Sequence, residues 1–313
     1  MRPTSLQKFT LVFGFGALGC SGASFTPEGQ GGQITMGGAS TAGSVSAGGT
    51  MASAGALGSG GAPSSGGTTT AGTTGGGTST GGTSTGGSGP MEIDCNAAMP
   101  SGGQLHSGNG RGGSGNLAWE IWSTTATGDL TTFSTPAFRA SWNNAGGYLG
   151  RLGFEWGNSG QPYDAHGTIT AQFVSRKTGS AGNYSYVGMY GWTNSPCIEW
   201  YIVDDSYNNM PINPGNTTNE GTVDIDGGSY IMYTRPTTGT GGSRCSGVSN
   251  WVQYYSVRTT ARECGQISLT EHFDAWDSLG MSLGNLLEAK ILVEVGGGNG
   301  SVDFPIANVT TTQ

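Results

Sequence analysis

The sequence has few charged side chains and few histidines. Of its 313 residues, 12 are Lys or Arg, 20 are Asp or Glu and three are His. The acidic excess excludes the basic surface that is typical of nucleic-acid-binding proteins. The three histidines, His106, His166 and His272, lack the spacing of metal ligands, so we expect no metal and no other cofactor. No apolar run reaches the length of about 18 residues that a membrane-spanning helix needs, which excludes such a helix.

Glycine and charge are unevenly distributed along the chain. Residues 21–90 hold 24 of the 61 glycines and a single charged side chain, Glu28. Residues 91–313 hold ten of the 12 basic residues, 19 of the 20 acidic residues and every Trp and Tyr. The first of these segments cannot bury enough apolar surface to offset its ordering entropy, so we expect a disordered Gly/Ser/Thr/Ala linker. The second is long enough for one sizeable hydrophobic core and is the predicted folded domain.

The first 20 residues have the pattern of an export signal. Arg2 and Lys8 precede a mostly apolar run over residues 9–19, and small residues lead to Cys20. This pattern resembles the bacterial lipoprotein signal, in which the cysteine carries the lipid and becomes the mature N-terminus. It predicts an exported protein that is held at the cell surface or outer membrane through Cys20. The alternative is an ordinary secretory signal that is cleaved near Ala23, which would give a secreted protein.

The folded segment has the composition of an all-β domain. Aromatic and β-branched runs alternate with turn residues, which favours a two-sheet β-sandwich. The four clearest predicted strands are 185–192, 197–204, 229–235 and 250–258. Helical spacing is convincing only over 268–283, where Ser268 and Glu271 form a capping-box pattern and Gly280 or Gly284 is a plausible end.

Two glutamates lie inside predicted strands. Glu199 stands between Ile198 and Trp200, and Glu294 stands in the apolar run 289–297. Glutamate is depleted in strands and costly to bury, so either a function or a structural salt bridge to an arginine would explain Glu199. Cleavage of a glycosidic bond requires two carboxyl groups that flank the bond, and aromatic side chains provide flat surfaces for sugars. Ordinary core packing is the alternative for most of these aromatics.

Six ordered motifs resemble glycoside hydrolase family 11, the small β-jelly-roll endo-1,4-β-xylanases, over most of residues 104–310. The motifs are Trp119–Trp122, Ala140–Asn144, Tyr190–Trp192 with Cys197–Asp204, Tyr254–Arg258, His272–Trp276 and Leu292–Glu294. The resemblance implies a jelly roll with one α-helix and a long cleft. It also implies hydrolysis of internal β-1,4-xylosidic bonds with retention of configuration, by a monomer whose partner is xylan.

The resemblance also implies roles for individual residues. Glu199 matches the nucleophile and Glu294 the general acid/base, which in a retaining enzyme lie about 5–5.5 Å apart. The expected substrate-binding residues are Trp122, Tyr190, Trp192, Tyr201, Arg235 and Gln253. Because xylose has no hydroxymethyl group, close aromatic walls could exclude glucose chains by shape.

Three departures from the family pattern concern the predicted cleft. Gly147 stands where the family has Asn or Asp near the acid/base, so the pH optimum cannot be transferred by analogy. The segment 235–248 replaces the usual tip of the thumb hairpin, and Val295–Gly296 replaces the usual Gly-Tyr after the acid/base.

Four cysteines remain after Cys20, and export would permit disulfides between them. Cys95, Cys197, Cys245 and Cys264 allow three connectivities. We expect Cys245–Cys264, which would link the thumb to the loop after Arg258; free or differently paired thiols are the alternative.

Two other functions remain open at this point. One is a non-catalytic carbohydrate-binding sandwich with the same aromatics, although the presence of both glutamates speaks against it. The other is a β-glucanase of related architecture. The relative hydrolysis of xylan, mixed-linkage glucan and carboxymethylcellulose would separate these hypotheses.

Overall fold

A computed structural model describes residues 92–125, 127–143, 146–239 and 243–312 of the chain. The predicted export signal and linker, residues 1–20 and 21–90, lie outside the described residues. In the part of the chain that is described, no helix has the length and apolar character needed to cross a membrane.

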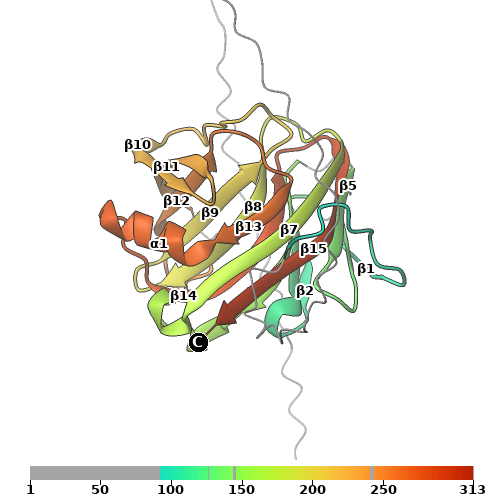
Figure 1. The fold of residues 1–313 in the computed structure, drawn as a ribbon, viewed down its shortest axis with the longest axis horizontal. Coiled ribbons are helices and arrows are strands. Elements are labelled where there is room, and N and C mark those ends of the chain that lie inside the picture. Colours follow the sequence, from blue (N-terminus) through green and yellow to red (C-terminus); the bar gives the residue numbers. More distant parts are fainter. Residues whose placement is uncertain (1–91, 126, 144–145, 240–242, 313) are drawn as a thin grey trace, which may run out of the picture. The chain divides into compact units, whose positions relative to one another are not determined.

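The described residues form two stacked β-sheets with one α-helix beside them (Figure 1). In spatial order, the smaller sheet contains β1 (Gln104–Ser107), β4 (Asp129–Thr132), β5 (Phe138–Asn143), β15 (Asn299–Thr312), β7 (Thr168–Gly179) and β13 (Cys264–Ser268). The larger sheet contains β10 (Thr218–Ile225), β11 (Gly228–Thr238), β12 (Asn250–Arg258), β9 (Ile198–Asp205), β8 (Ser185–Asn194), β14 (Asn285–Val295), β6 (Tyr148–Glu155), β3 (Ala118–Ser123) and β2 (Gly110–Gly112). The helices are α1 (Leu269–Ser278) and three 3₁₀ turns, Gly115–Leu117, Gly157–Ser159 and Tyr163–His166. The predicted two-sheet β-sandwich with a single α-helix is therefore confirmed.

Side chains alternate between two hydrophobic clusters along the strands of the larger sheet. On β9, Ile198, Trp200 and Ile202 belong to the core between the sheets. Tyr201 and Val203 belong to a second cluster on the opposite face. This separation of the two faces follows from the two-residue period of a strand.

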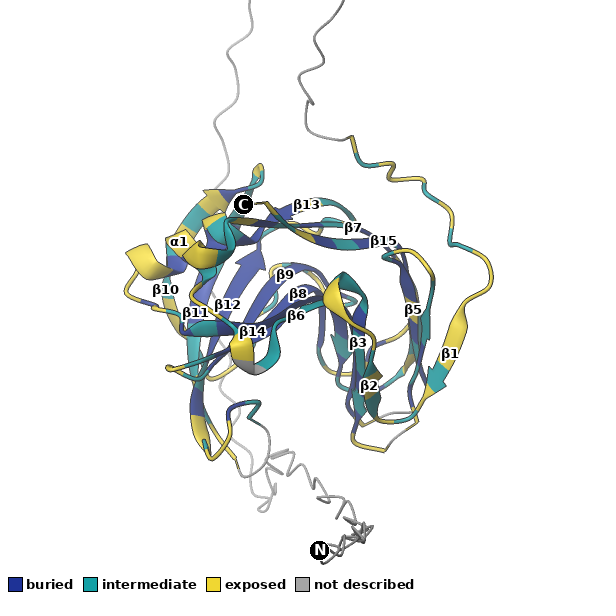
Figure 2. Ribbon diagram, turned by 90° about the horizontal axis from the view of Figure 1, so that it is seen from below, coloured by how far each residue is buried: buried dark blue, intermediate teal, exposed yellow. Residues whose placement is uncertain are grey.

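The smaller sheet covers one face of the larger sheet and leaves the other face free of a second layer. Figure 2 shows the larger sheet bent, so that this second face is concave. We call it the concave face; its buried side chains are those of the second cluster, which includes Tyr190, Trp192 and Tyr201.

Helix α1 closes one side of the core between the sheets. Phe273 and Trp276 are fully buried, and their rings lie 5.1 and 6.4 Å from the ring of Trp200 on β9. These two residues share a face because they are three positions apart. Burial of three large aromatic rings fixes the helix against the sheet that carries Glu199.

The predicted ends of this helix are partly wrong. The helix stops before Gly280, whose φ of +78° suits glycine, so the later end at Gly284 is excluded. Ser268 precedes the helix but makes no side-chain capping bond. Its hydroxyl donates to Asp226 at 2.7 Å instead, because the hairpin turn between β10 and β11 brings that carboxylate close.

Candidate active site

Glu199 lies on β9 with its side chain on the concave face, where it is 7% exposed. Its Oε1 accepts hydrogen bonds from the hydroxyls of Tyr190 at 2.8 Å and Tyr201 at 2.9 Å. Its Oε2 accepts bonds from Trp251 Nε1 at 2.9 Å and Gln253 Nε2 at 2.6 Å. Four donors on two oxygens satisfy the carboxylate and fix it in position.

All four donors are uncharged, so a structural salt bridge to an arginine does not explain the burial of Glu199. Among the ion pairs of the described residues, none includes Glu199. A buried carboxylate without a cationic partner is costly, and four hydrogen bonds are what offset that cost here.

Strand register places the donors around Glu199. Gln253 on β12 and Trp192 on β8 are its direct cross-strand neighbours. Arg235 on β11 lies opposite Gln253, and its Nε donates to Gln253 Oε1 at 2.5 Å. That bond fixes the orientation of the amide, because Oε1 accepts from Arg235 while Nε2 is left to donate to Glu199. The resemblance predicted both Arg235 and Gln253 as substrate-binding residues, but the hydrogen bond between them was not predicted.

Glu294 lies on β14, also facing the concave side, and is partly exposed. Its cross-strand neighbours are Tyr186 on β8 and Leu149 on β6. The hydroxyl of Tyr184 donates to its Oε1 at 3.4 Å, whereas its Oε2 has no hydrogen-bond partner among the described residues. Glu294 therefore has one oxygen that accepts a hydrogen bond and one buried oxygen without a partner among the described residues.

The two glutamates interact electrostatically. Burial and the negative charge of Glu199 raise the pKa of Glu294 to about 7. Hydrogen bonding to Tyr201 and the charges of Arg235 and Arg151 act in the opposite direction but do not cancel the rise. The hydroxyl of Tyr201 thus influences the pKa of Glu294 while it donates its hydrogen bond to Glu199. Glu294 therefore keeps its proton to a higher pH than an ordinary glutamate does, near a carboxylate that four hydrogen bonds hold in place.

The predicted aromatic residues differ in how far they are exposed. Trp122 on β3 is partly exposed and lies two strands away from Glu294, opposite Leu149. Tyr190, Tyr201 and Trp192 are all buried, and Trp192 is only 1% exposed. Trp192 Nε1 donates to the hydroxyl of Tyr190 at 2.5 Å, so it supports a residue that contacts Glu199.

Gly147 lies immediately before β6, close to Trp122. Its backbone N–H donates to Thr124 Oγ1 at 2.9 Å, and a Cβ added there would lie 3.5 Å from the Trp122 ring. An Asn or Asp at this position would therefore reach the concave face. The glycine leaves that position without a polar side chain near Glu294.

A cluster of charged side chains on the same face was not predicted. Its members come from β3, β6, β14 and the segment between β11 and β12: Glu120, Arg151, Glu155, Glu288, Lys290 and Arg244. Arg151 also lies over the ring of Tyr190, 4.5 Å from its centre, so the cluster adjoins the surroundings of Glu199. The alternation of charge and apolar residues over 285–295 was the available signal, since Glu288, Lys290 and Glu294 share one face.

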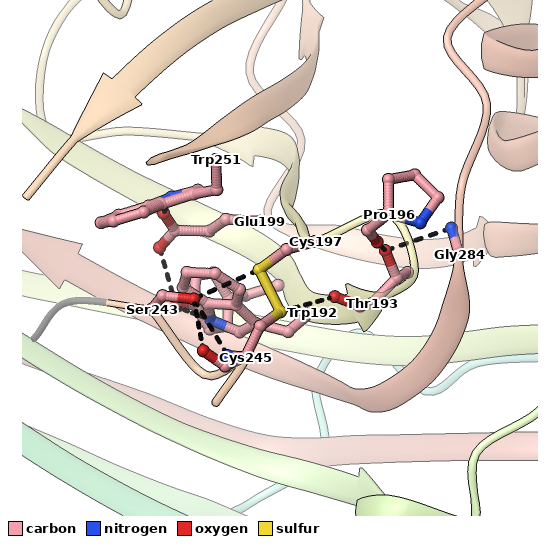
Figure 3. The surroundings of a disulfide bond; sticks show 10 residues. Trp192, Thr193, Pro196, Cys197, Glu199, Ser243, Cys245, Trp251 and Gly284 are labelled. Carbon is pink, nitrogen blue, oxygen red and sulfur yellow. Dashed lines mark hydrogen bonds between the residues drawn. A yellow bond between two sulfur atoms is a disulfide. The ribbon is translucent and has the colours of Figure 1, made fainter. Parts of the chain in front are cut away.

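The predicted disulfide Cys245–Cys264 is wrong. The structure contains Cys95–Cys264 and Cys197–Cys245. Cys264 begins β13 in the smaller sheet, whereas Cys245 lies over the concave face of the larger one, so the sandwich separates them. Figure 3 shows Cys197–Cys245 beside Trp192, close to Glu199 and Trp251. The disulfide thus ties the β11–β12 connection to the residue that stands two positions before Glu199.

In the described part of the chain, no three His, Cys, Asp or Glu side chains gather as metal ligands would. The site on the concave face contains two carboxyl groups, those of Glu199 and Glu294. The fold and this pair define a glycoside hydrolase of the β-jelly-roll class.

Comparison with known proteins identifies the family within this class. The model of glycosyl hydrolases family 11 matches residues 114–305, and the chain belongs to this family. It is similar to endo-1,4-beta-xylanase S20 of Neocallimastix patriciarum, with 42% identity over 61% of this chain and 57% of the relative. It is also similar to endo-1,4-beta-xylanase A of Bacillus pumilus, with 33% identity over 69% of this chain and 89% of the relative.

The chain spans about half the length of the first of these relatives. Among solved structures, it is similar to wild-type ENZbleach xylanase, with a TM-score of 0.63 and 31% identity over 70% of this chain and 94% of the other. The similarity to both sets confirms the jelly-roll architecture that the sequence motifs implied.

Proposed function

We propose that the protein is an endo-1,4-β-xylanase that cleaves internal xylosidic bonds with retention of configuration. The observation that carries this proposal is the pair on the concave face of a family 11 fold. Glu199 accepts four hydrogen bonds, and Glu294, beside it, has a pKa of about 7. A retaining enzyme needs a carboxylate nucleophile and a general acid that keeps its proton; the hydrogen bonds to Glu199 and the raised pKa of Glu294 support these two roles.

The first step joins the sugar to the enzyme. Glu294 donates its proton to the oxygen of the glycosidic bond, and one oxygen of Glu199 attacks the anomeric carbon. The bond between that carbon and the glycosidic oxygen breaks, so one part of the chain leaves with the proton and the other is bound covalently to Glu199.

The second step reverses the roles of the carboxyl groups. Once Glu199 is esterified, its negative charge is gone and the pKa of Glu294 falls, so that Glu294 stays ionised and can act as a base. Glu294 takes a proton from water, the water oxygen attacks the anomeric carbon, and the ester bond to Glu199 breaks. Both glutamates return to their starting states.

The remaining predicted residues would position these groups and the sugar. Tyr190 and Tyr201 donate to Glu199, and Arg235 orients Gln253, which donates to the other oxygen. Trp122 is a partly exposed aromatic on this face and is the proposed stacking surface for a sugar. Trp192, which is buried, is proposed to support Tyr190 and to form part of the wall beneath the sugar.

Xylan is the proposed substrate and the proposed partner of a monomeric enzyme. The relatives named above are xylanases, and the buried aromatics around Glu199 are the proposed walls that would exclude the hydroxymethyl group of glucose chains. Reducing-end release from xylan, mixed-linkage glucan and carboxymethylcellulose tests this choice. Hydrolysis of xylan alone supports the proposal, hydrolysis of the glucans would indicate a β-glucanase, and binding without products would indicate a carbohydrate-binding module.

The assignment of the pair has its own test. Glu294→Gln should remove nearly all release of reducing ends from xylan, while Glu271→Gln, which changes an exposed carboxyl group on α1, should leave activity unchanged. Circular dichroism of both variants reports whether the fold is kept. Activity like that of the wild type in Glu294→Gln contradicts the assignment.

For the N-terminal part we propose export, lipid anchoring through Cys20 and a flexible linker over residues 21–90. The pattern of basic, apolar and small residues before Cys20 supports the anchor, and the near absence of charge supports the linker. Cys20→Ser should move the activity from the membrane fraction to the soluble fraction of the exported protein. Activity that is soluble in both forms would favour the secreted alternative.

A further inference from the structure

The short segment Ser243–Cys245 lies between β11 and β12 and is fixed at two points. Cys245 is bonded to Cys197, just before β9, and its sulfur lies 3.1 Å from the carbonyl oxygen of Thr193 on β8. The hydroxyl of Ser243 contacts the sulfur of Cys197 at 3.2 Å and accepts a bond from the N–H of Cys245 at 2.9 Å. We call the three residues Ser243, Arg244 and Cys245 the strap.

Arg244, in the middle of the strap, forms ion pairs with three other strands. Its Nη1 lies 3.0 Å from Glu120 on β3, and its Nη2 lies 3.3 Å from Glu155 on β6 and 3.5 Å from Glu288 on β14. Burial opposes ionisation of Glu120, but the charges of Arg151, Arg244 and Lys290 outweigh it and lower its pKa to about 2. All three carboxylates are at most about one quarter exposed, so these pairs are only weakly screened by solvent.

The strap crosses the concave face from one side to the other. In the larger sheet the order is β12, β9, β8, β14, β6 and β3. The strap leaves the β11–β12 hairpin, contacts the residue before β9 and then β8 through Cys245, and reaches β14, β6 and β3 through Arg244. It does so where β8 ends and β9 begins, at the end of the concave face next to Glu199.

The strap also covers part of this face. Trp192 faces the concave side directly opposite Glu199, yet it is only 1% exposed. Cys245 and Trp251 belong to the same buried cluster, and the Trp192 and Trp251 rings lie 5.7 Å apart. Cys197 is only two residues, or about 7 Å along the strand, from Glu199. A sugar chain that lies along the strands past Glu294 and Glu199 therefore meets the strap after a short run of units.

We propose that Arg244 determines the cleavage position by closing this end of the substrate groove. This inference rests on the proposed function. An oligosaccharide is held with one end against the strap, so its bonds reach the glutamate pair at a fixed distance from that end. For a long polymer chain to be cleaved internally, its part beyond the cleavage site must leave the groove before it reaches the strap.

The first test compares cleavage positions in a reducing-end-labelled xylohexaose. The wild type should give one dominant labelled product. Arg244→Ala should spread cleavage over neighbouring bonds and change the ratio of the two main labelled products about tenfold, which corresponds to about 1.4 kcal/mol. Arg111→Ala is the matched control, because Arg111 lies 3.9 Å from Glu155 in the same cluster but is exposed and outside the strap.

A second pair of variants frees the strap without changing its charge. Cys197→Ser with Cys245→Ser removes the covalent tie and should shift the product ratio in the same direction as Arg244→Ala. Cys95→Ser with Cys264→Ser removes the other disulfide, far from the strap in the smaller sheet, and should leave the ratio unchanged. Thermal unfolding followed by circular dichroism identifies a temperature at which all variants are folded. The product ratios are compared at that temperature.

The outcomes separate this inference from the proposed function. If the wild type does not hydrolyse xylan, the proposed function fails. If it does, but Arg244→Ala gives the wild-type product ratio, the closure by Arg244 is refuted while the function stands. An equal loss of activity on all bonds without a shift in the ratio also refutes the closure, because it would make Arg244 an ordinary binding residue.

Discussion

The carboxylate of Glu199 and the carboxyl group of Glu294 are coupled through charge. Glu199 is the largest neighbouring charge that raises the pKa of Glu294, which reaches about 7. Glu199 accepts four hydrogen bonds, whereas Oε2 of Glu294 has no partner among the described residues. Glu199 is thus held by hydrogen bonds, whereas Glu294 keeps its proton to a higher pH than an ordinary glutamate does.

The first prediction concerns the pH dependence of xylan hydrolysis. The acid form of Glu294 is needed for bond cleavage, and this form is lost as the pH rises through about 7. We expect kcat/KM to fall above this pH by about tenfold for each further unit, as for a single titrating acid. Initial rates measured between pH 4 and 9 test this. A rate that stays constant to pH 9 contradicts the assignment of Glu294 as the acid.

The second prediction isolates the charge of Glu199. Glu199→Gln removes the negative charge that raises the pKa of Glu294, so that pKa should fall, although burial still opposes ionisation. Titration of selectively ¹³C-labelled glutamate side chains by NMR measures it directly. Tyr184→Phe is the control, because it removes the hydrogen bond to Glu294 and keeps the charge of Glu199. An unchanged pKa in Glu199→Gln means that burial alone sets the value.

Local patterns in the sequence predicted much of the fold. The four strands expected over 185–258 are β8, β9, β11 and β12, with ends that differ by up to three residues. The turn signal at Asp226–Gly227 is a true hairpin turn, in which both residues have positive φ. These features succeed because alternation and turn chemistry are short-range properties.

Long-range contacts could not be predicted in the same way. The disulfide prediction failed because Cys245 and Cys264 are close in sequence but far apart in the fold: Cys264 begins β13 of the smaller sheet, whereas Cys245 lies over the concave face of the larger one. The charged cluster around Arg244 also escaped prediction, because its members come from four separate parts of the chain. The positions of Glu199 and Glu294 were identified, but their coupling depends on strand order, which alternation does not determine.

The third prediction concerns the hydrogen-bond chain from Arg235 to Glu199. Gln253→Ala removes the donor at 2.6 Å from Glu199 Oε2 and leaves Arg235 without its amide partner. We expect kcat/KM on xylan to fall about 10- to 100-fold, or about 1.4–2.7 kcal/mol. Thr237→Val is the matched control, since Thr237 also bonds to Gln253 Oε1, at 3.0 Å, but does not reach Glu199. Equal effects of the two changes would show that the donor to Glu199 is unimportant.

The last prediction concerns stability in acid and a buried histidine. His272 on α1 is fully buried, neither ring nitrogen has a hydrogen-bond partner among the described residues, and Tyr230 packs against it at 4.5 Å. Burial, together with the charges of Arg262 and Arg258, lowers its pKa to about 3. The folded protein thus keeps His272 neutral, while the unfolded chain protonates it below a pKa of about 6.5.

The direction in which pH changes the stability follows from this difference between the pKa of His272 in the folded and the unfolded state. Because the unfolded state binds the proton first, the free energy of unfolding falls as the pH decreases from about 6.5 toward 3, by about 3 kcal/mol at pH 4. His272→Phe, which keeps an aromatic ring against Tyr230, should remove this part of the pH dependence. Urea unfolding of both proteins at pH 7 and pH 4 measures it, with His166→Phe as the control because that ring is only half-buried. If His272→Phe loses as much stability between pH 7 and pH 4 as the wild type does, His272 is not the group whose protonation destabilises the fold.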